Sequence, residues 1–206
     1  MVNVRGGSRS RREEYSEATR QALVDSAVER FADRGYARTS LDEIVAAARV
    51  TKGALYHHFD GKQALFEAAL RQLADAAVEA LATAAAEAET AWDAALASLD
   101  IYLDQCRDPA YGRIVVQEGP VALGFPKWQE YERDHAYGFT EGVLRALMDE
   151  GFVRPLPLEA TTQVVFGMLN AAALAIAHAP EAEQERVVEE MKAVFRRFLD
   201  GLRVPR

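Results

Sequence analysis

The sequence is poor in cysteine, and its 206 residues include only Cys106. No disulfide can therefore form within the chain, and such sparing use of cysteine is typical of a reducing compartment. We expect a cytoplasmic protein in which Cys106 is a small packed residue rather than a redox sensor.

Apolar runs long enough to cross a bilayer are also missing, since a spanning helix needs about 20 consecutive apolar residues. The longest candidate, residues 164–177, is interrupted by Gly167 and Asn170. We expect this segment to form a buried or interface helix, and we expect no membrane partner.

Sequence signatures of common enzymes are absent as well. There is no nucleophile elbow, no phosphate-binding glycine loop, no HExxH zinc motif and no cysteine cluster. His57 and His58 are adjacent, and neighbouring residues on a helix point about 100° apart, so they are poorly placed to chelate one ion. The chain is therefore predicted to be no enzyme and to bind neither a metal nor a cofactor.

Charge is distributed unevenly along the chain, whose formal net charge is −8. Residues 1–62 have a formal net charge of +2 and the remaining residues one of −10. The N-terminal part is therefore basic although the whole chain is acidic. The first twelve positions hold four arginines and no acidic residue, among glycines and serines. This composition predicts a flexible basic arm that could follow a DNA groove, or a leader without structure.

Residues 39–66 contain the most informative pattern, in which short helices are separated by tight turns. Ser40 followed by Glu43 is a capping box, which predicts a helix from Leu41. Apolar residues then recur at the spacing of one helical face. Only a short turn, which includes Arg49, separates this helix from the next.

The second helix spans about residues 52–59 and is preceded by Thr51, a good N-cap residue. Leu55 and Phe59 are four residues apart and can face a core, while the polar side chains between them point outward. Two helices joined by so short a turn cross steeply, which is the geometry of a helix-turn-helix.

A third helix is expected to start at Gly61, because Asp60 and Gln63 have the spacing of another N-cap. It would carry Lys62 in its first turn, where the helix dipole disfavours a cation. A phosphate bound by both the helix N-terminus and Lys62 would remove this conflict. The segment as a whole therefore has the features of a DNA-binding head.

The segment contains three short motifs: Thr39-Ser40, Lys52-Gly53-Ala54-Leu55-Tyr56-His57-His58-Phe59 and Lys62-Gln63-Ala64-Leu65. In these motifs it resembles the DNA-binding region of the TetR family of bacterial transcriptional regulators. One departure is Arg49, at a turn position where the family usually has glycine. If the backbone there has a positive φ, a side chain is strained, and the turn is re-formed or Arg49 contacts a phosphate.

The resemblance and the outward-pointing polar groups together predict a DNA-binding surface. A lysine at the N-terminal end of a recognition helix suits guanine O6 and N7. The alternatives are a solvated Lys52, a half-buried Tyr56 and ordinary surface histidines. The expected DNA-binding residues are Thr39, Ser40, Thr51, Lys52, Gly53, Ala54, Tyr56, His57, His58 and Lys62.

All remaining segments favour helix, with neither strand alternation nor an internal repeat. We expect an all-α fold of about nine helices, in which an N-terminal helix-turn-helix head stands on a larger helical body. The expected domains are a basic arm (1–14), a DNA-binding domain (15–62) and a ligand-binding and dimerisation domain (63–206). Helices are expected over about 16–34, from 41, and over 52–59, 61–89, 92–106, 110–118, 127–150, 158–178 and 181–202, with a loop at 119–126.

The resemblance implies that the body binds a small molecule and that the last two helices pair with those of a second subunit. The residues themselves support pairing, because the helix over 158–178 is apolar on most sides and must be covered on most sides. We expect a homodimer that reads two operator half-sites. A single-subunit protein is the alternative.

Aromatic residues with polar tips accumulate between positions 92 and 150, where they could line an apolar cavity, although each alone could be ordinary core. Asn170 lies in an apolar helix and needs a partner: a ligand, the opposing subunit or neighbouring backbone. The expected ligand-binding residues are Trp92, Tyr102, Cys106, Phe125, Trp128, Tyr131, His135, Phe139 and Asn170.

These expectations combine into a ligand-responsive transcriptional regulator, a homodimeric repressor released from a palindromic operator by a small molecule. Ligand binding would shift the population of head arrangements, with the helix over 61–89 as the lever. The alternative is a helical ligand-binding or protein-partner module without specific DNA binding, which only Arg49 favours.

Overall fold

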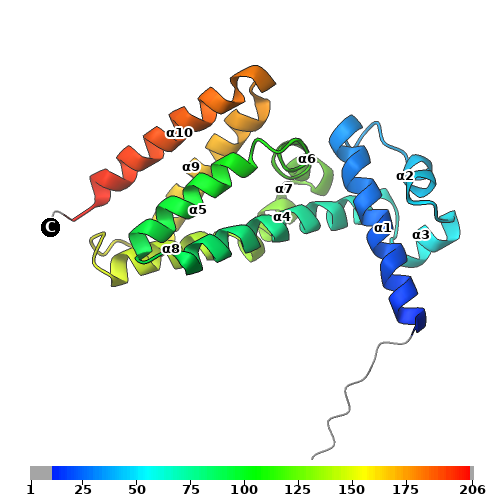
Figure 1. Cartoon of the computed structure of the whole chain (residues 1–206), viewed down its shortest axis with the longest axis horizontal. Coiled ribbons are helices and arrows are strands. Elements are labelled where there is room, and N and C mark those ends of the chain that lie inside the picture. The colour runs from blue at the N-terminus through cyan, green and yellow to red at the C-terminus, as the bar shows by residue number, and fades with distance from the viewer. Residues whose placement is uncertain (1–10, 205–206) are drawn as a thin grey trace, which may run out of the picture.

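The computed structural model describes residues 11–204, which are helical nearly throughout (Figure 1). Two π-helical segments, labelled η, continue into neighbouring α-helices, so the described residues form nine continuous helices. The all-α prediction is confirmed. The elements are α1 (Arg11–Arg34), α2 (Leu41–Ala48), α3 (Lys52–His58), α4 (Lys62–Glu87), α5 (Ala91–Gln105), η1 (Tyr111–Glu118), α6 (Gly119–Leu123), α7 (Phe125–Glu132), η2 (Arg133–Tyr137), α8 (Gly138–Asp149), α9 (Leu158–His178) and α10 (Glu181–Leu202).

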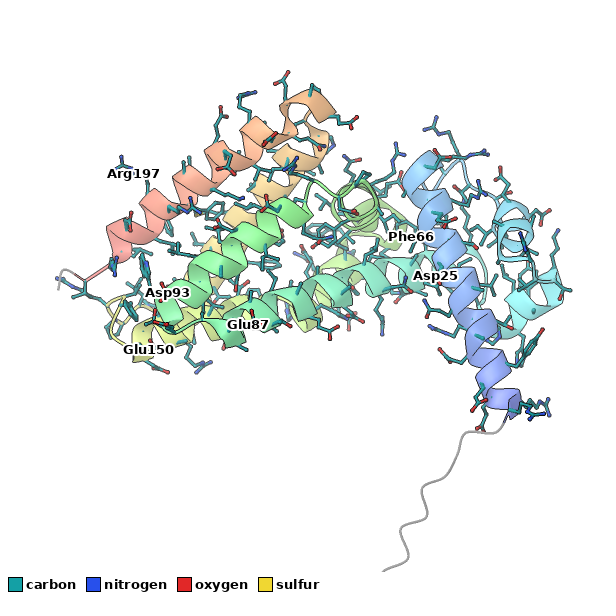
Figure 2. All side chains as sticks on the ribbon, viewed as in Figure 1. Asp25, Phe66, Glu87, Asp93, Glu150 and Arg197 are labelled. Atoms are coloured by element: carbon teal, nitrogen blue, oxygen red, sulfur yellow. The ribbon has the colours of Figure 1, made fainter. Side chains whose placement is uncertain are left out.

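Helices α1 to α3 form a head at one end of the molecule, and α4 runs from this head along the body (Figure 1). Phe66 lies close to the crossing of α1 and α4 (Figure 2), with its ring centroid 5.1 Å from that of Phe31 and 4.9 Å from that of Tyr36. Phe31 and Phe66 are completely buried. Burial of each such side chain contributes roughly 1.5–3 kcal/mol, so this aromatic cluster fastens the head to α4.

The body is held together by apolar packing and by charged contacts between helices that are distant in sequence. The buried Lys192 on α10 donates to Asp104 on α5, with 2.9 Å between Nζ and Oδ1. Glu150, at the end of α8, accepts from the backbone N–H of Ala91 at 3.0 Å and so caps α5, as Figure 2 lets the reader follow. These contacts position α5 and α10 as two walls of the body.

Two predicted boundaries near the head differ from the observed ones. Helix α1 begins at Arg11 rather than residue 16, since acidic residues in its first turn stabilise a helix N-terminus. Residues 11–14 of the predicted arm are therefore helical, and residues 1–10 lie outside the described part. The N-cap of α4 is Gly61, at φ 115°, and not the predicted Asp60.

The loop predicted over residues 119–126 was wrong. Pro126 occupies the first turn of α7, where a missing N–H breaks no helical hydrogen bond. Pro120 is the second residue of α6, directly after the π-helical segment η1. Only Gly124, at φ 80°, interrupts the helical path. The long helix predicted after this loop is continuous, but it contains the π-helical turn η2.

Candidate DNA interface and ligand cavity

The turn between α2 and α3 is tight and carries an unusual residue. Arg49 has φ 56° and ψ 38°, the left-handed conformation, and is the one non-glycine residue with positive φ in the described part of the chain. Backbone N–H groups of Arg49 and Val50 donate back to the end of α2 at 3.2 Å each. Ile44 and Leu55 are almost fully buried beneath the two helices. The turn thus retains the helix-turn-helix geometry despite the missing glycine.

The start of α3 is exposed and polar. The predicted N-cap is confirmed, because the Thr51 side chain accepts from the backbone N–H of Ala54 at 3.2 Å. Beyond it Lys52, Tyr56 and His57 are exposed, and Tyr56 retains 61% of its accessible surface. An aromatic side chain with so much free surface is available to a partner rather than to the core.

Lys52 has a partner within the head. Its ammonium lies 2.7 Å from Oδ1 of Asp42 in the first turn of α2, and both side chains are exposed. The hydrogen bond to Asp42 raises the pKa of Lys52. Exposed pairs of this kind are weak, so a phosphate or a guanine edge can compete for the lysine.

Thr39 and Ser40 hold the head together. The Thr39 hydroxyl is buried and is shared between the carbonyls of Gly35 at 2.9 Å and Arg30 at 3.1 Å. Ser40 forms the predicted capping box with Glu43: its backbone N–H donates to Oε2 at 2.8 Å, and its hydroxyl accepts from the Glu43 N–H at 3.2 Å. Both side chains therefore position the start of α2.

The side chains of Lys62 and His58 also contact other residues of the head. The Lys62 ammonium lies 4.5 Å above the Tyr36 ring and donates to the Ala37 carbonyl at 3.3 Å. His58 is half-buried against α1, beside Arg20, and burial lowers its pKa. Fewer of the predicted DNA-binding side chains are therefore exposed than expected, and the exposed ones are centred on α3.

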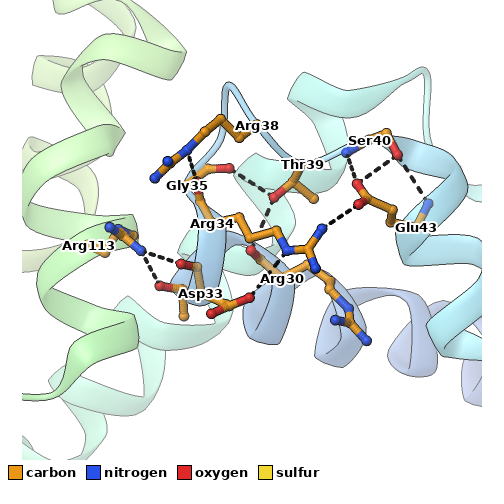
Figure 3. A network of polar contacts seen from close by, with 10 residues as sticks. Arg30, Asp33, Arg34, Gly35, Arg38, Thr39, Ser40, Glu43 and Arg113 are labelled. Carbon is orange, nitrogen blue, oxygen red and sulfur yellow. Dashed lines mark hydrogen bonds and ion pairs between the residues drawn. The ribbon is translucent and has the colours of Figure 1, made fainter.

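A polar network joins this head to the body (Figure 3). Arg113 on η1 donates to the backbone carbonyls of Ala32 at 2.6 Å and Asp33 at 2.8 Å, at the end of α1. Arg34 then reaches Glu43 at 2.6 Å, and Glu43 completes the capping box of α2. The body thus contacts the end of α1, and from there Arg34 reaches the capping box of α2.

The body contains an apolar cavity of about 280 Å³, walled by α4, α5, η1 and α7 to α10. Its volume is close to the lower end of the range for small-molecule sites. Six of the nine predicted ligand-binding residues line it: Tyr102, Trp128, Tyr131, His135, Phe139 and Asn170.

The other three predicted ligand-binding residues lie elsewhere. Trp92 packs on Phe152 at the far end of the body, with the Arg203 guanidinium 4.4 Å above its ring. Phe125 is 65% exposed on the outside of α7. Cys106 is buried outside the cavity wall, and burial raises the pKa of its thiol to about 12, so it is a packed neutral residue.

Glu132 is a cavity residue that the sequence pattern did not single out, and it is the one carboxylate among the described lining residues. Its Oε1 accepts from the Asn170 side-chain amide at 2.7 Å, which gives Asn170 the partner that its position required. Burial raises the pKa of Glu132, while the hydrogen bond from Asn170 opposes the shift. The only signal in the sequence was an acidic residue beside Tyr131 in an aromatic segment.

Helices α9 and α10 expose apolar side chains on the outside of the body. Val164 and Val194 are 59% exposed and Leu174 is 46% exposed. By length and composition α9 is apolar enough to cross a membrane, since its most apolar stretch of 18 residues has a mean hydropathy of 1.5. Only 22% of that stretch is buried. In the single chain, α9 and α10 therefore share a broad apolar face that is exposed to solvent.

A helix-turn-helix head joined to a body with an apolar cavity is typical of the class of ligand-responsive DNA-binding regulators. The family description "Bacterial regulatory proteins, tetR family" matches residues 23–69, and "Tetracyclin repressor-like, C-terminal domain" matches residues 92–202. The chain belongs to the TetR family and is a ligand-responsive, DNA-binding transcriptional regulator. The family consists of regulators rather than enzymes.

Some similar proteins match nearly the whole chain, and another matches about a quarter of it. The Transposon Tn10 TetC protein of Escherichia coli is 26% identical over 196 residues, 95% of this chain and 98% of that protein. The probable acrEF/envCD operon repressor of Escherichia coli K12 is 48% identical over 48 residues, 23% of this chain and 22% of that protein. A solved TetR-family regulator from Pectobacterium atrosepticum is 30% identical, with a TM-score of 0.80 over 96% of this chain and 99% of that one.

Proposed function

We propose that the protein is a homodimeric repressor that a small molecule releases from a palindromic operator. The observation that carries this proposal is that η1 lines the cavity with Tyr111 and Val115 and also holds the head through Arg113. A ligand can therefore act on the element that positions α1. Repression is supported by the relative described as a probable operon repressor.

The second subunit would cover the apolar face of α9 and α10. Four helices, two from each subunit, then form a bundle that buries Val164, Leu174 and Val194, as helices with broad apolar faces require. Paired heads match the two-fold symmetry of a palindrome. DNA as the partner, with a single buried thiol, supports a cytoplasmic location.

The DNA contacts would centre on the N-terminal end of α3. Lys52 would break its ion pair with Asp42 and contact a base edge or a phosphate of the DNA. Tyr56 and His57 would contact the sugar-phosphate backbone of the DNA. Thr51, Gly53 and Ala54 lie where the helix can approach the groove closely, as exposed or half-exposed residues. Thr39, Ser40, His58 and Lys62 would support this surface from within the head.

The coupling would run through α4 and η1 together. Both elements line the cavity, and both contact α1, so a ligand that favours one packing of the cavity also favours one tilt of the head. Such a ligand acts only through its different affinity for the two arrangements. On this scheme the body comprises residues 63–206 and the DNA-binding head ends near residue 62.

The test is selection of the purified protein against a pool of random duplex DNA, at two salt concentrations. Recovery of a palindrome whose binding survives the higher salt supports an operator-binding dimer, since phosphate attraction alone is lost with salt. Retention of all sequences alike, or none, from folded protein would instead favour a helical module without specific DNA binding.

A further inference from the structure

The described residues that line the cavity include a negatively charged side chain but no lysine or arginine. Glu132 is the one carboxylate among these lining residues. The lining residues also include one histidine, His135. Its Nε2 lies 3.7 Å from the Asp75 carboxylate on α4, and its Nδ1 lies 2.8 Å from the Tyr131 carbonyl. The cavity wall is therefore neutral or negative.

The Glu132 carboxylate has unused acceptor capacity. Among the described residues it has one hydrogen-bond partner, the Asn170 amide at 2.7 Å. An ionised carboxylate offers about four acceptor positions, and a partly buried charge with few partners is costly. A ligand that brings positive charge and N–H donors would supply what this carboxylate lacks.

The surrounding wall also fits a cation. Trp128 stacks on Tyr131 with 5.8 Å between ring centroids, and Tyr131 stacks on His135 at 4.0 Å. This stacking covers the faces of Tyr131. The rings of Tyr102, Phe139 and Phe166 also line the cavity, and aromatic faces attract ammonium groups that have lost their water. Of the three buried polar atoms without a hydrogen-bond partner in the described residues, two are hydroxyls of lining residues, Ser98 and Tyr131. These hydroxyls are available to a polar ligand group.

We propose that the cavity selects an organic cation, an amine carried on an apolar or aromatic body, with Glu132 as its counter-charge. The aromatic wall surrounds the body of the ligand, and Asn170 holds the carboxylate in place. A carboxylate ligand is disfavoured, because it would place a second negative charge beside Glu132 in an apolar site. This inference rests on the proposed function, in which the cavity holds the effector.

Three probes of matched shape test the charge preference: 4-phenylbutylamine, 4-phenylbutanol and 4-phenylbutyrate. Each is titrated calorimetrically into the full-length protein at pH 7.5, and binding to the wild-type chain is compared with Glu132→Gln. Glutamine keeps the shape and can still accept from Asn170. Glu130→Gln, which removes an exposed charge from the same helix, is the matched control.

We expect the wild-type protein to bind the amine at least tenfold more tightly than the alcohol, and the carboxylate most weakly. Glu132→Gln should remove the advantage of the amine and leave the alcohol unchanged, whereas Glu130→Gln should leave all three unchanged. Equal binding of amine and alcohol, an unaffected Glu132→Gln variant, or no binding of any probe would overturn the inference.

The same proteins are then assayed on the DNA sequence recovered by selection. Sequence-specific DNA binding that persists when no probe binds would show that the cation inference has failed and the regulator has not. Tight amine binding that requires Glu132, in a protein that recovers no specific DNA sequence, would instead support the cation site and reject the repressor.

Discussion

At the scale of the residue, Arg49 shows how a substitution within a motif is tolerated. The turn requires the left-handed conformation, and this chain adopts it with a residue that has a Cβ atom. Such a conformation costs roughly 1–2 kcal/mol for a residue other than glycine. The sequence predicted that Arg49 lies in the turn and that a positive φ there would strain it, because the spacing between the helices determines where the turn falls.

Arg49→Gly is expected to stabilise the protein by about 1 kcal/mol, since glycine removes the left-handed penalty but gains freedom in the unfolded chain. For a chain of this size the melting temperature should rise by about 2–4 °C. Arg49→Ala is the control and should not stabilise, because alanine retains Cβ. An unchanged melting temperature for the glycine variant would show that the turn is not strained.

Lys52→Ala is expected to weaken operator binding about tenfold, which corresponds to about 1.4 kcal/mol. Fluorescence anisotropy at several salt concentrations checks this. A relaxed sequence preference would indicate a base contact, and a salt slope lower by about one would indicate a phosphate contact. Arg107→Ala, at an exposed site of the body, should leave binding unchanged, and the dimer should persist in both variants.

Glu132→Gln is expected to stabilise the free protein more at pH 8 than at pH 4.5. Burial raises the pKa of Glu132 above its ordinary value of 4.5, so the folded state retains the proton longer than the unfolded state. Stability is therefore lost as the pH rises through the folded pKa, and glutamine avoids this loss. Urea unfolding across this pH range measures the difference, with Glu130→Gln as control; a pH-independent difference would contradict the explanation.

At the scale of the element, local hydrogen bonds and long-range packing have separate effects. The capping box of α2 and the bounds of α9 and α10 were predicted, because capping residues and apolar spacing act within a few positions. The π-helical segments were not predicted. Their longer hydrogen-bonded turns occur where η1 and η2 line the cavity, and such turns often occur at functional sites.

Arg113→Gln is expected to loosen the head without unfolding the body, since η1 would lose its contacts with two carbonyls of α1. Amide exchange of residues 34–40 should become faster, as expected when a local opening costs less free energy. Arg107→Gln is the matched control, with the same change at an exposed position of the body. Unchanged exchange in the Arg113 variant would mean that Arg113 does not position the head.

At the scale of the whole molecule, the apolar face of α9 and α10 is incomplete in one chain. Its side chains are exposed although α9 is the most apolar long helix described. Large exposed apolar faces mark interaction sites. Pairing of two chains through this face would bury it and place two heads on one operator.

Val194→Asp should convert the dimer to monomers at micromolar concentration, because a carboxylate would be buried without a partner. Light scattering coupled to size exclusion measures the mass. Val121→Asp is the control, since Val121 is 83% exposed on α6, away from α9 and α10. A dimer that survives Val194→Asp would place the interface elsewhere.

The sequence by itself determined most of the helices, the helix-turn-helix and the family, because caps, turns and apolar spacing act over short distances along the chain. Tertiary structure decided which polar groups are free. It turned Thr39 and Lys62 toward the head, removed Phe125 from the cavity and brought Glu132 within reach of Asn170, 38 positions away. Such contacts depend on how helices pack, which no local pattern specifies.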